Sequence, residues 1–295
     1  MATDITSVDP APGKASSTVM RRPVAHRLGA IRAIVSRDIR SSFRGYPKLI
    51  AAVLIPTVLL VAVAGGSDGF RRALTEPYGT YVAFSSYLLP GLVGLILLLT
   101  GSHAAVSIAT GRDSEGLRIF MSAPLPRWLV VFAKLLAVAL LVVVQASIFL
   151  LVASLTGVDV DFLAWLAAIP AVMIGVFMIT AAIISLVAFL PSAGRRSALI
   201  LYVVVPAFFL STSLYPIWRF TDGGADYLSL IVTGNPFTHV VELIRYASEG
   251  QLSVASLAVV AGLGVLAFLS AVAGVNPRRN PAEWRRSGWG AGQED

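Results

Sequence analysis

Long apolar segments recur along the chain and are separated by short polar ones. A helix needs about 20 mainly apolar residues to cross the hydrocarbon core of a bilayer. The pattern predicts six such helices, at residues 49–64, 81–109, 129–155, 162–190, 198–216 and 252–274. The first is short and contains Pro56, so we expect it to include the Tyr46–Pro47 corner or to cross a locally thinner bilayer. The sequence therefore predicts an all-α integral membrane protein.

The composition supports a membrane protein. Of the 295 residues, 56% are hydrophobic and only 13% are charged, whereas a soluble domain carries roughly 25% charged residues. The chain has no cysteine, which excludes disulfides, thiolate metal sites and a cysteine nucleophile. The net charge of +7 is typical of basic cytoplasmic loops, so we expect membrane lipid rather than nucleic acid as a partner.

Lysine and arginine alternate from one side of the predicted bundle to the other. The loops 65–80, 156–161 and 217–251 carry only four of the 23 basic residues. The other 19 lie in the two tails, in the loops after spans two and four, and at Lys134 just inside span three. The positive-inside rule then places both termini in the cytoplasm, in a multi-pass protein of the cell inner (plasma) membrane. We expect residues 1–25 to form a disordered cytoplasmic tail. Residues 26–275 should form the membrane domain, and residues 276–295 a second cytoplasmic tail.

Residues 26–45 show a different periodicity. Apolar residues recur there at steps of three and four, and arginines occupy much of the rest, namely Arg32, Arg37, Arg40 and Arg44. This pattern predicts an N-terminal amphipathic interfacial helix. Its role is left open between a membrane-surface anchor and a docking site for a partner.

The loop between spans two and three combines charge with apolar residues. Leu117, Phe120 and Met121 share one helical face, and Asp113, Glu115 and Arg118 flank it. A short helix that presents apolar residues to the cytoplasm indicates contact with a groove on a partner. The alternative is packing against the protein's own spans.

The segment 228–247 predicts a broken re-entrant helical pair between spans five and six. Asn235 stands where a helix N-cap is expected, with Pro236 at the first helical position. His239, Glu242 and Arg245 follow at steps of three and form one polar stripe. Glu242 can pair with His239 or with Arg245, and an ion pair with Arg245 is the interpretation we favour.

Catalytic motifs are absent from the sequence. Residues 11–17, "APGKASS", lack the first glycine of a phosphate-binding loop, so we expect no ATP hydrolysis by this chain alone. His239 and Glu242 lack a third metal ligand. His103, inside span two, is either a proton relay or a hydrogen-bonded structural residue. We therefore predict no enzyme, no metal site and no cofactor bound by this chain.

Three segments resemble one known family. They are "STSLYPI" at 211–217, "NPFTHVVELIR" at 235–245 and "RDSEGLRIFMSAPLPRW" at 112–128. Together with the six spans, they resemble the membrane subunit of a type-2 ABC exporter, including permeases associated with quinoprotein alcohol oxidation. The chain departs from the family pattern at Thr212, where glycine is usual, and at Asp113 and Arg118 in the inner loop.

The resemblance implies a transmembrane permease subunit that forms the substrate path with a second permease subunit. Separate ATPase subunits would bind ATP and drive it. The inner loop would couple to the ATPase, and the stripe after Asn235 would support an external gate. The scarcity of buried charge favours a hydrophobic or amphipathic substrate. A secondary transporter or channel, with intramembrane acids or a polar filter, and a membrane-embedded transferase, with clustered acids, are the alternatives.

Overall fold

The computed structural model describes residues 24–65, 72–73, 77–78, 82–110, 125–188, 198, 200–218 and 226–274. These residues are almost entirely helical. The elements of more than five residues are α1 (Val24–Arg44), α2 (Tyr46–Gly65), α3 (Phe84–Thr110), α5 (Arg127–Leu155), α6 (Phe162–Ala188), α10 (Asp226–Gly234), α11 (Pro236–Ser248) and α12 (Val254–Gly274). The shorter elements are the π-helix η2 (Ile200–Val204), the helix α8 (Val205–Phe209) and two strands, β1 (Arg72–Ala73) and β2 (Val82–Ala83). The two strands pair antiparallel.

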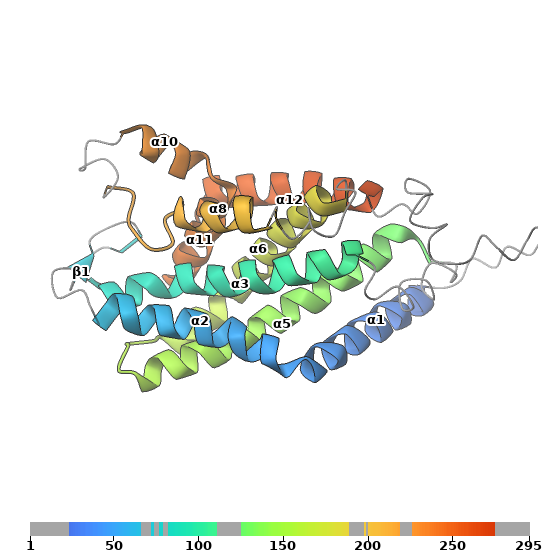
Figure 1. The fold of residues 1–295 in the computed structure, drawn as a ribbon, viewed down its shortest axis with the longest axis horizontal. Coiled ribbons are helices and arrows are strands. Elements are labelled where there is room, and N and C mark those ends of the chain that lie inside the picture. Colours follow the sequence, from blue (N-terminus) through green and yellow to red (C-terminus); the bar gives the residue numbers. More distant parts are fainter. Residues whose placement is uncertain are drawn as a thin grey trace, which may run out of the picture.

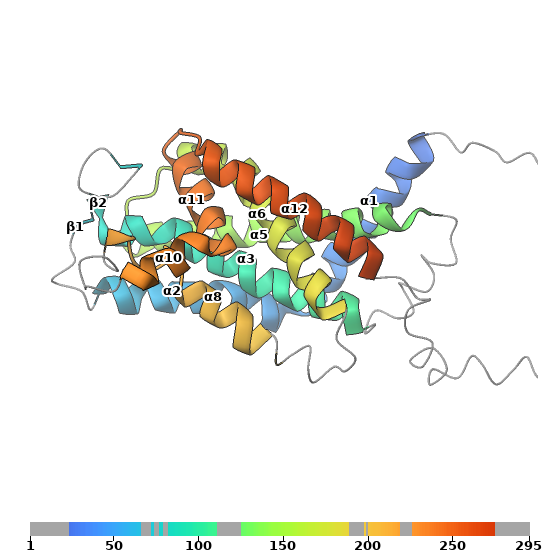
Figure 2. The same cartoon turned by 90° about the horizontal axis from the view of Figure 1, so that it is seen from above.

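The long helices lie side by side along one axis and form a bundle (Figure 1). Helix α3 packs against α2, α5 and α6, and α12 packs against α6. Helix α1 projects from one end of the bundle, and β1, β2 and α10 lie at the opposite end (Figure 2). The chain elements predicted for the two membrane sides are therefore separated along the bundle axis.

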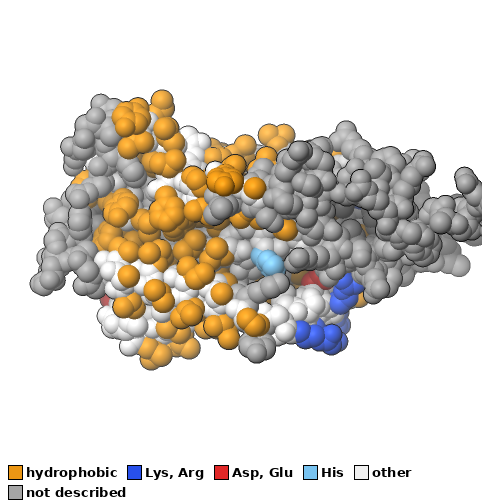
Figure 3. Space-filling view, viewed as in Figure 1, with side chains coloured by type: hydrophobic (Ala, Val, Ile, Leu, Met, Phe, Trp, Pro, Cys, Tyr) orange, Lys and Arg blue, Asp and Glu red, His pale blue; other side chains and the backbone are white. Residues whose placement is uncertain are grey.

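The central position of α3 follows from its composition. The helix is apolar on all sides, which is typical of a buried helix, and Leu92, Val93, Ile96 and Leu97 have no exposed surface. Helix α12 differs, since it buries one face against α6 and leaves Leu266 and its neighbours exposed. Hydrophobic side chains also cover much of the face seen in Figure 3, while lysine and arginine lie at the α1 end. Such an outer surface suits lipid better than water.

The described helices confirm a multi-pass membrane protein and part of the predicted span set. Helices α3, α5, α6 and α12 are long and apolar enough to cross a bilayer, and α1 with α2 gives a fifth candidate if the bent pair counts as one span. The fifth predicted span, over 198–216, stays a prediction. The described helices there, η2 and α8, have five residues each, and the chain leaves helical geometry after Phe209.

The predicted N-terminal amphipathic helix is α1. It meets α2 at an angle of 67° and packs on α5. Ile34 is fully buried, whereas Arg32, Arg40 and Arg44 are exposed and Arg37 is partly exposed. Leu28 and Phe43 are also exposed, so the apolar face of α1 and its position in the membrane interface stay predictions.

Candidate functional site

Directly after α8 the chain runs as turns through a buried region. The first four residues of the segment 211–217, Ser211 to Leu214, are all at most 6% exposed. Backbone that leaves helical geometry inside an apolar bundle needs protein partners for its carbonyl and amide groups. The next helix pair supplies two of these partners.

Asn235 joins the ends of two helices. Its Oδ1 accepts a hydrogen bond from the Phe237 amide at 3.0 Å, which caps α11 as the sequence predicts. Its Nδ2 donates to the carbonyl oxygens of Ala207 at 2.6 Å and Leu210 at 2.7 Å. One amide side chain therefore satisfies a donor at the start of α11 and two acceptors at the end of α8.

Arg245 supplies the second partner. Its Nη2 donates to the Thr212 carbonyl oxygen at 2.8 Å, and the same oxygen accepts from the Tyr87 hydroxyl at 3.0 Å. The guanidinium carbon lies 4.3 Å from the centroid of the Tyr87 ring, within the range of a cation–π contact. Only 3% of Arg245 is exposed. Helices α3 and α11 thus hold one backbone carbonyl between them.

Aromatic rings surround this contact. Phe84 stacks on Tyr87 with ring centroids 5.9 Å apart, and Tyr78 meets the Tyr87 ring edge-on at 6.4 Å. Burial raises the pKa of Tyr78 to about 12, and the positive charge of Arg245 opposes that rise. The Tyr78 phenol therefore stays neutral beside the guanidinium.

The favoured ion pair between Glu242 and Arg245 is wrong. Glu242 Oε2 instead accepts a hydrogen bond from Ser256 Oγ of α12 at 3.1 Å and lies 4.0 Å from His239 Nδ1. Arg245 extends the other way, toward α3 and Thr212, because the turn there presents a carbonyl that no helix satisfies. Of the two partners that the spacing allowed, the structure selects His239.

Helix α11 is largely enclosed by protein. It packs among α3, α6 and α12. Only the His239 and Glu242 side chains of its polar stripe are partly exposed, at 19% and 29%. The close approach depends on glycine in α6, since a side chain at Gly175 would meet Val240 Cγ1 at 2.6 Å.

A second glycine fixes the position of the buried turn. A side chain at Gly91 of α3 would overlap the backbone of Ser213, so α3 and the turn touch without intervening atoms. With Asn235, Arg245 and Tyr87, this contact defines what we call the turn anchor, the set of residues that holds 207–213 in place. Sequence reasoning missed Tyr87 and Gly91, and the phenol of Tyr87 inside a predicted span was the available signal.

The proposed coupling residues lie outside the described part of the chain. These residues are Asp113, Glu115, Leu117, Arg118, Phe120 and Met121. The role assigned to them stays a prediction. Within the described ranges, no three His, Asp or Glu side chains come together as metal ligands.

The bundle of apolar helices and the buried broken helix define a polytopic membrane protein. A family model described as "ABC-2 type transporter" matches residues 29–248, so the chain belongs to the ABC-2 type transporter family. It is also 26% identical over 222 residues to a protein of Porphyra purpurea named "Putative transport permease ycf38", covering 73% of this chain and 72% of that protein. Permeases of this family are transport subunits that work with ABC ATPase subunits.

Proposed function

We propose that this chain is one transmembrane subunit of an ATP-driven exporter. It would form the substrate path with a second permease subunit, and separate ATPase subunits would bind ATP. The observation that carries the proposal is the turn anchor, in which the 211–217 and 235–245 segments meet on the Thr212 carbonyl. The family match supports transport, and the joined segments give the subunit a rigid unit that it can move.

The charge distribution supports an orientation for this unit. If the positive-inside rule holds, α1 and the 111–124 loop face the cytoplasm, and the turn anchor lies toward the outer side of the inner (plasma) membrane. When ATP closes the partner ATPases, their movement would be transmitted to the permease through the 111–124 loop and α1. Lys134 of α5 bonds Asp38 of α1 at 3.1 Å, which gives α1 a direct path to the spans.

The substrate class follows from the lining available to it. The two cations buried in the described spans are already engaged, Arg245 by Thr212 and Lys134 by Asp38. An ion would need other buried charge to replace its hydration. A hydrophobic or amphipathic substrate needs none, so we propose that class.

Copurification tests the ATPase partnership. The tagged permease, extracted from native membranes, should bring down an ATPase with a phosphate-binding loop. Phe120→Asp places a charge on the predicted contact face and should release that ATPase while the permease stays inserted. Ile119→Asp is the matched control, because residue 119 lies on the opposite side of the same predicted helix. Wild type without any ATPase would contradict the proposal, and ATPase retained by Phe120→Asp would contradict the docking face.

A substitution at Glu242 tests whether its charge acts in the proposed external gate. A glutamine at 242 still offers an oxygen to Ser256, so Glu242→Gln should leave ATP-dependent transport in inverted vesicles close to wild type. Transport lost in this variant, with ATPase copurification retained, would mean that the carboxylate charge itself contacts substrate or opens the path.

A further inference from the structure

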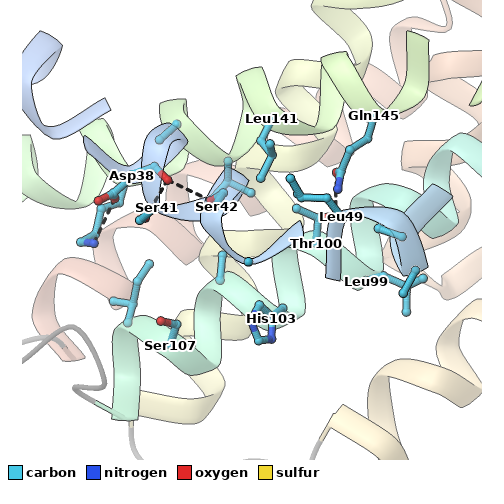
Figure 4. A pocket seen from close by; sticks show the side chains of 18 of the residues that line it. Asp38, Ser41, Ser42, Leu49, Leu99, Thr100, His103, Ser107, Leu141 and Gln145 are labelled. Atoms are coloured by element: carbon cyan, nitrogen blue, oxygen red, sulfur yellow. Dashed lines mark hydrogen bonds and ion pairs between the residues drawn. The ribbon is translucent and has the colours of Figure 1, made fainter. Parts of the chain in front are cut away.

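A cavity lies at the elbow between α1 and α2, on the side of the bundle away from the turn anchor. It has a volume of about 470 Å³ and is lined by α1, α2, α3 and α5 (Figure 4). Ser41 and Ser42 border it from α1, His103 from α3, and Lys134 and Gln145 from α5. Among the residues that the structure describes, none of the proposed gate set contributes to its wall.

The cavity is long and its polarity changes along its length. Lys134 and Gln145 are about 16 Å apart along α5, which is roughly half the thickness of a bilayer core. The elbow end carries the ion pair between Asp38 and Lys134 at 3.1 Å. The wall between the two ends is largely apolar, with Leu141 of α5 facing the space from the middle of this stretch.

A polar pair closes the deep end. Thr100 Oγ1 donates to Gln145 Oε1 at 2.8 Å, and Gln145 is only 3% exposed. The charged elbow end and the largely apolar wall follow the polarity that one leaflet of a bilayer presents from its headgroups inward, and the Thr100–Gln145 pair, whose polar groups bond each other, marks where the space ends.

The shape of the space suits a thin occupant. A volume of about 470 Å³ that extends over about 16 Å describes a narrow space. An extended acyl chain is thin and suits apolar walls that line such a space. Exposed apolar residues of α2, such as Leu54 and Val58, continue the bundle's lipid-facing surface beside the cavity.

Charge at the elbow end favours an anionic headgroup. Lys134 neutralises Asp38, and Arg37 lies 3.7 Å from the same carboxylate. Arg37 and Arg44 flank the face of α1 that borders the cavity, because both are within one helical turn of Ser41. With Asp38 already paired, these arginines leave the elbow end positive, and basic residues near a membrane surface attract anionic lipid.

We propose that the cavity binds one anionic phospholipid from the leaflet on the α1 side. Its acyl chain lies between α2, α3 and α5, and its phosphate lies beside the arginines of α1. The site goes beyond the proposed function and requires neither ATP nor a transport direction. A bound lipid also fills a space that packed helices would otherwise leave empty.

Photolabelling of the full chain tests the site. The protein is placed in phosphatidylcholine vesicles that contain a little phosphatidylglycerol with a diazirine in mid-chain, and adducts are mapped by mass spectrometry. We expect adducts on Leu99 and Leu141. Ala137→Trp fills the cavity and should lower this labelling about tenfold. Val144→Trp adds the same side chain to the exposed face of α5 and should leave it unchanged.

Two further arms keep the test decisive. Ser41→Trp, at an exposed position, blocks the elbow end of the cavity. It should lower the labelling as Ala137→Trp does, and it takes the place of that variant if Ala137→Trp fails to fold. Arg37→Gln and Arg44→Gln should each lower phosphatidylglycerol labelling about fivefold and leave labelling by a phosphatidylcholine probe unchanged.

Two results would overturn the proposal. Adducts spread evenly over outward residues such as Ile148, and insensitive to both tryptophans, would remove the site. Equal labelling by the two probes would remove the anionic headgroup. Either result leaves the exporter proposal standing, because that proposal depends on ATPase copurification alone.

Discussion

The Thr212 carbonyl receives two hydrogen bonds from helices that are far apart in the chain. Tyr87 of α3 and Arg245 of α11 both donate to it, and the guanidinium also lies over the phenol ring. Three groups in mutual contact do not contribute independently, since removing one changes the surroundings of the other two. Removing both donors should therefore change the free energy of unfolding by an amount that differs from the sum of the two single changes.

Substitutions at these two donors should show that coupling. Tyr87→Phe keeps the ring under the guanidinium and should cost about 1 kcal/mol for one hydrogen bond. Arg245→Ala removes a hydrogen bond and the cation–π contact, and should cost about 2–4 kcal/mol. Denaturant unfolding in detergent measures both variants and the double variant. A double variant equal to the sum of the singles would show that the three groups act separately.

The pKa of Tyr78 adds a test by pH. Its value of about 12 lies above the ordinary value of 10, so the folded state holds the phenol proton more tightly than the unfolded state does. The resulting contribution to stability is complete below pH 10 and is lost as pH rises toward 12, by at most about 3 kcal/mol. Unfolding measured at pH 9 and pH 11 should differ less in Tyr78→Phe than in wild type. An unchanged difference would contradict the raised pKa.

At the scale of elements, an ion pair joins α1 to α5 beside the α1–α2 elbow. Lys134 is 3% exposed, whereas the Asp38 side chain is 17% exposed and also lies 3.7 Å from Arg37. The two partners are therefore unequal. A buried ammonium without this carboxylate is more costly than a carboxylate that keeps water and a neighbouring arginine.

This inequality predicts an asymmetric pair of variants. Asp38→Asn should destabilise α1 by about 2–4 kcal/mol, and Lys134→Met, which keeps an unbranched apolar stem, by less than half of that. Protease cleavage within α1 reports its release from α5, and Ser36→Ala on the same helix serves as a control. Equal cleavage of the two variants would mean that Asp38 does not hold α1.

At the scale of the whole molecule, the ends of the bundle differ in charge and in structure. The basic helix α1 lies at one end, and β1, β2 and α10 lie at the other (Figure 2). The loop assignment from lysine and arginine gives the same two ends. From these two observations we expect the segments at opposite ends of the bundle to face different compartments.

Cysteine labelling checks this orientation, because the chain has no cysteine of its own. Single cysteines at Ser7, Asp222 and Ser287 can be probed in intact cells with a membrane-impermeant thiol reagent. We expect labelling of Asp222→Cys alone, from the positive-inside rule. Labelling at Ser7→Cys or Ser287→Cys, with Asp222→Cys silent, would reverse the orientation and the assigned coupling side.

Features set by neighbouring residues could be predicted from the sequence, whereas contacts between residues far apart in the chain could not. The helix break at Asn235 was predictable because an N-cap and a proline act within a few residues. The partner of Arg245 was not, since Thr212 is 33 positions away and only the packing of α11 brings the two together. The hydrogen bond between Ser256 and Glu242 could not be predicted either, because the two residues belong to different helices. The span over 198–216 stays a prediction, because its described part contains a π-helix and a turn, which hydropathy does not register.

The role of Asn235 has a consequence for biosynthesis. The carbonyls of Ala207 and Leu210 leave the ribosome 28 and 25 residues before the side chain that satisfies them. At about 5–20 residues per second, this interval lasts roughly one to six seconds. During that time the end of α8 cannot enter lipid without leaving carbonyls unpaired. The insertion machinery must therefore keep the end of α8 hydrated or shielded from lipid until α11 has been synthesised.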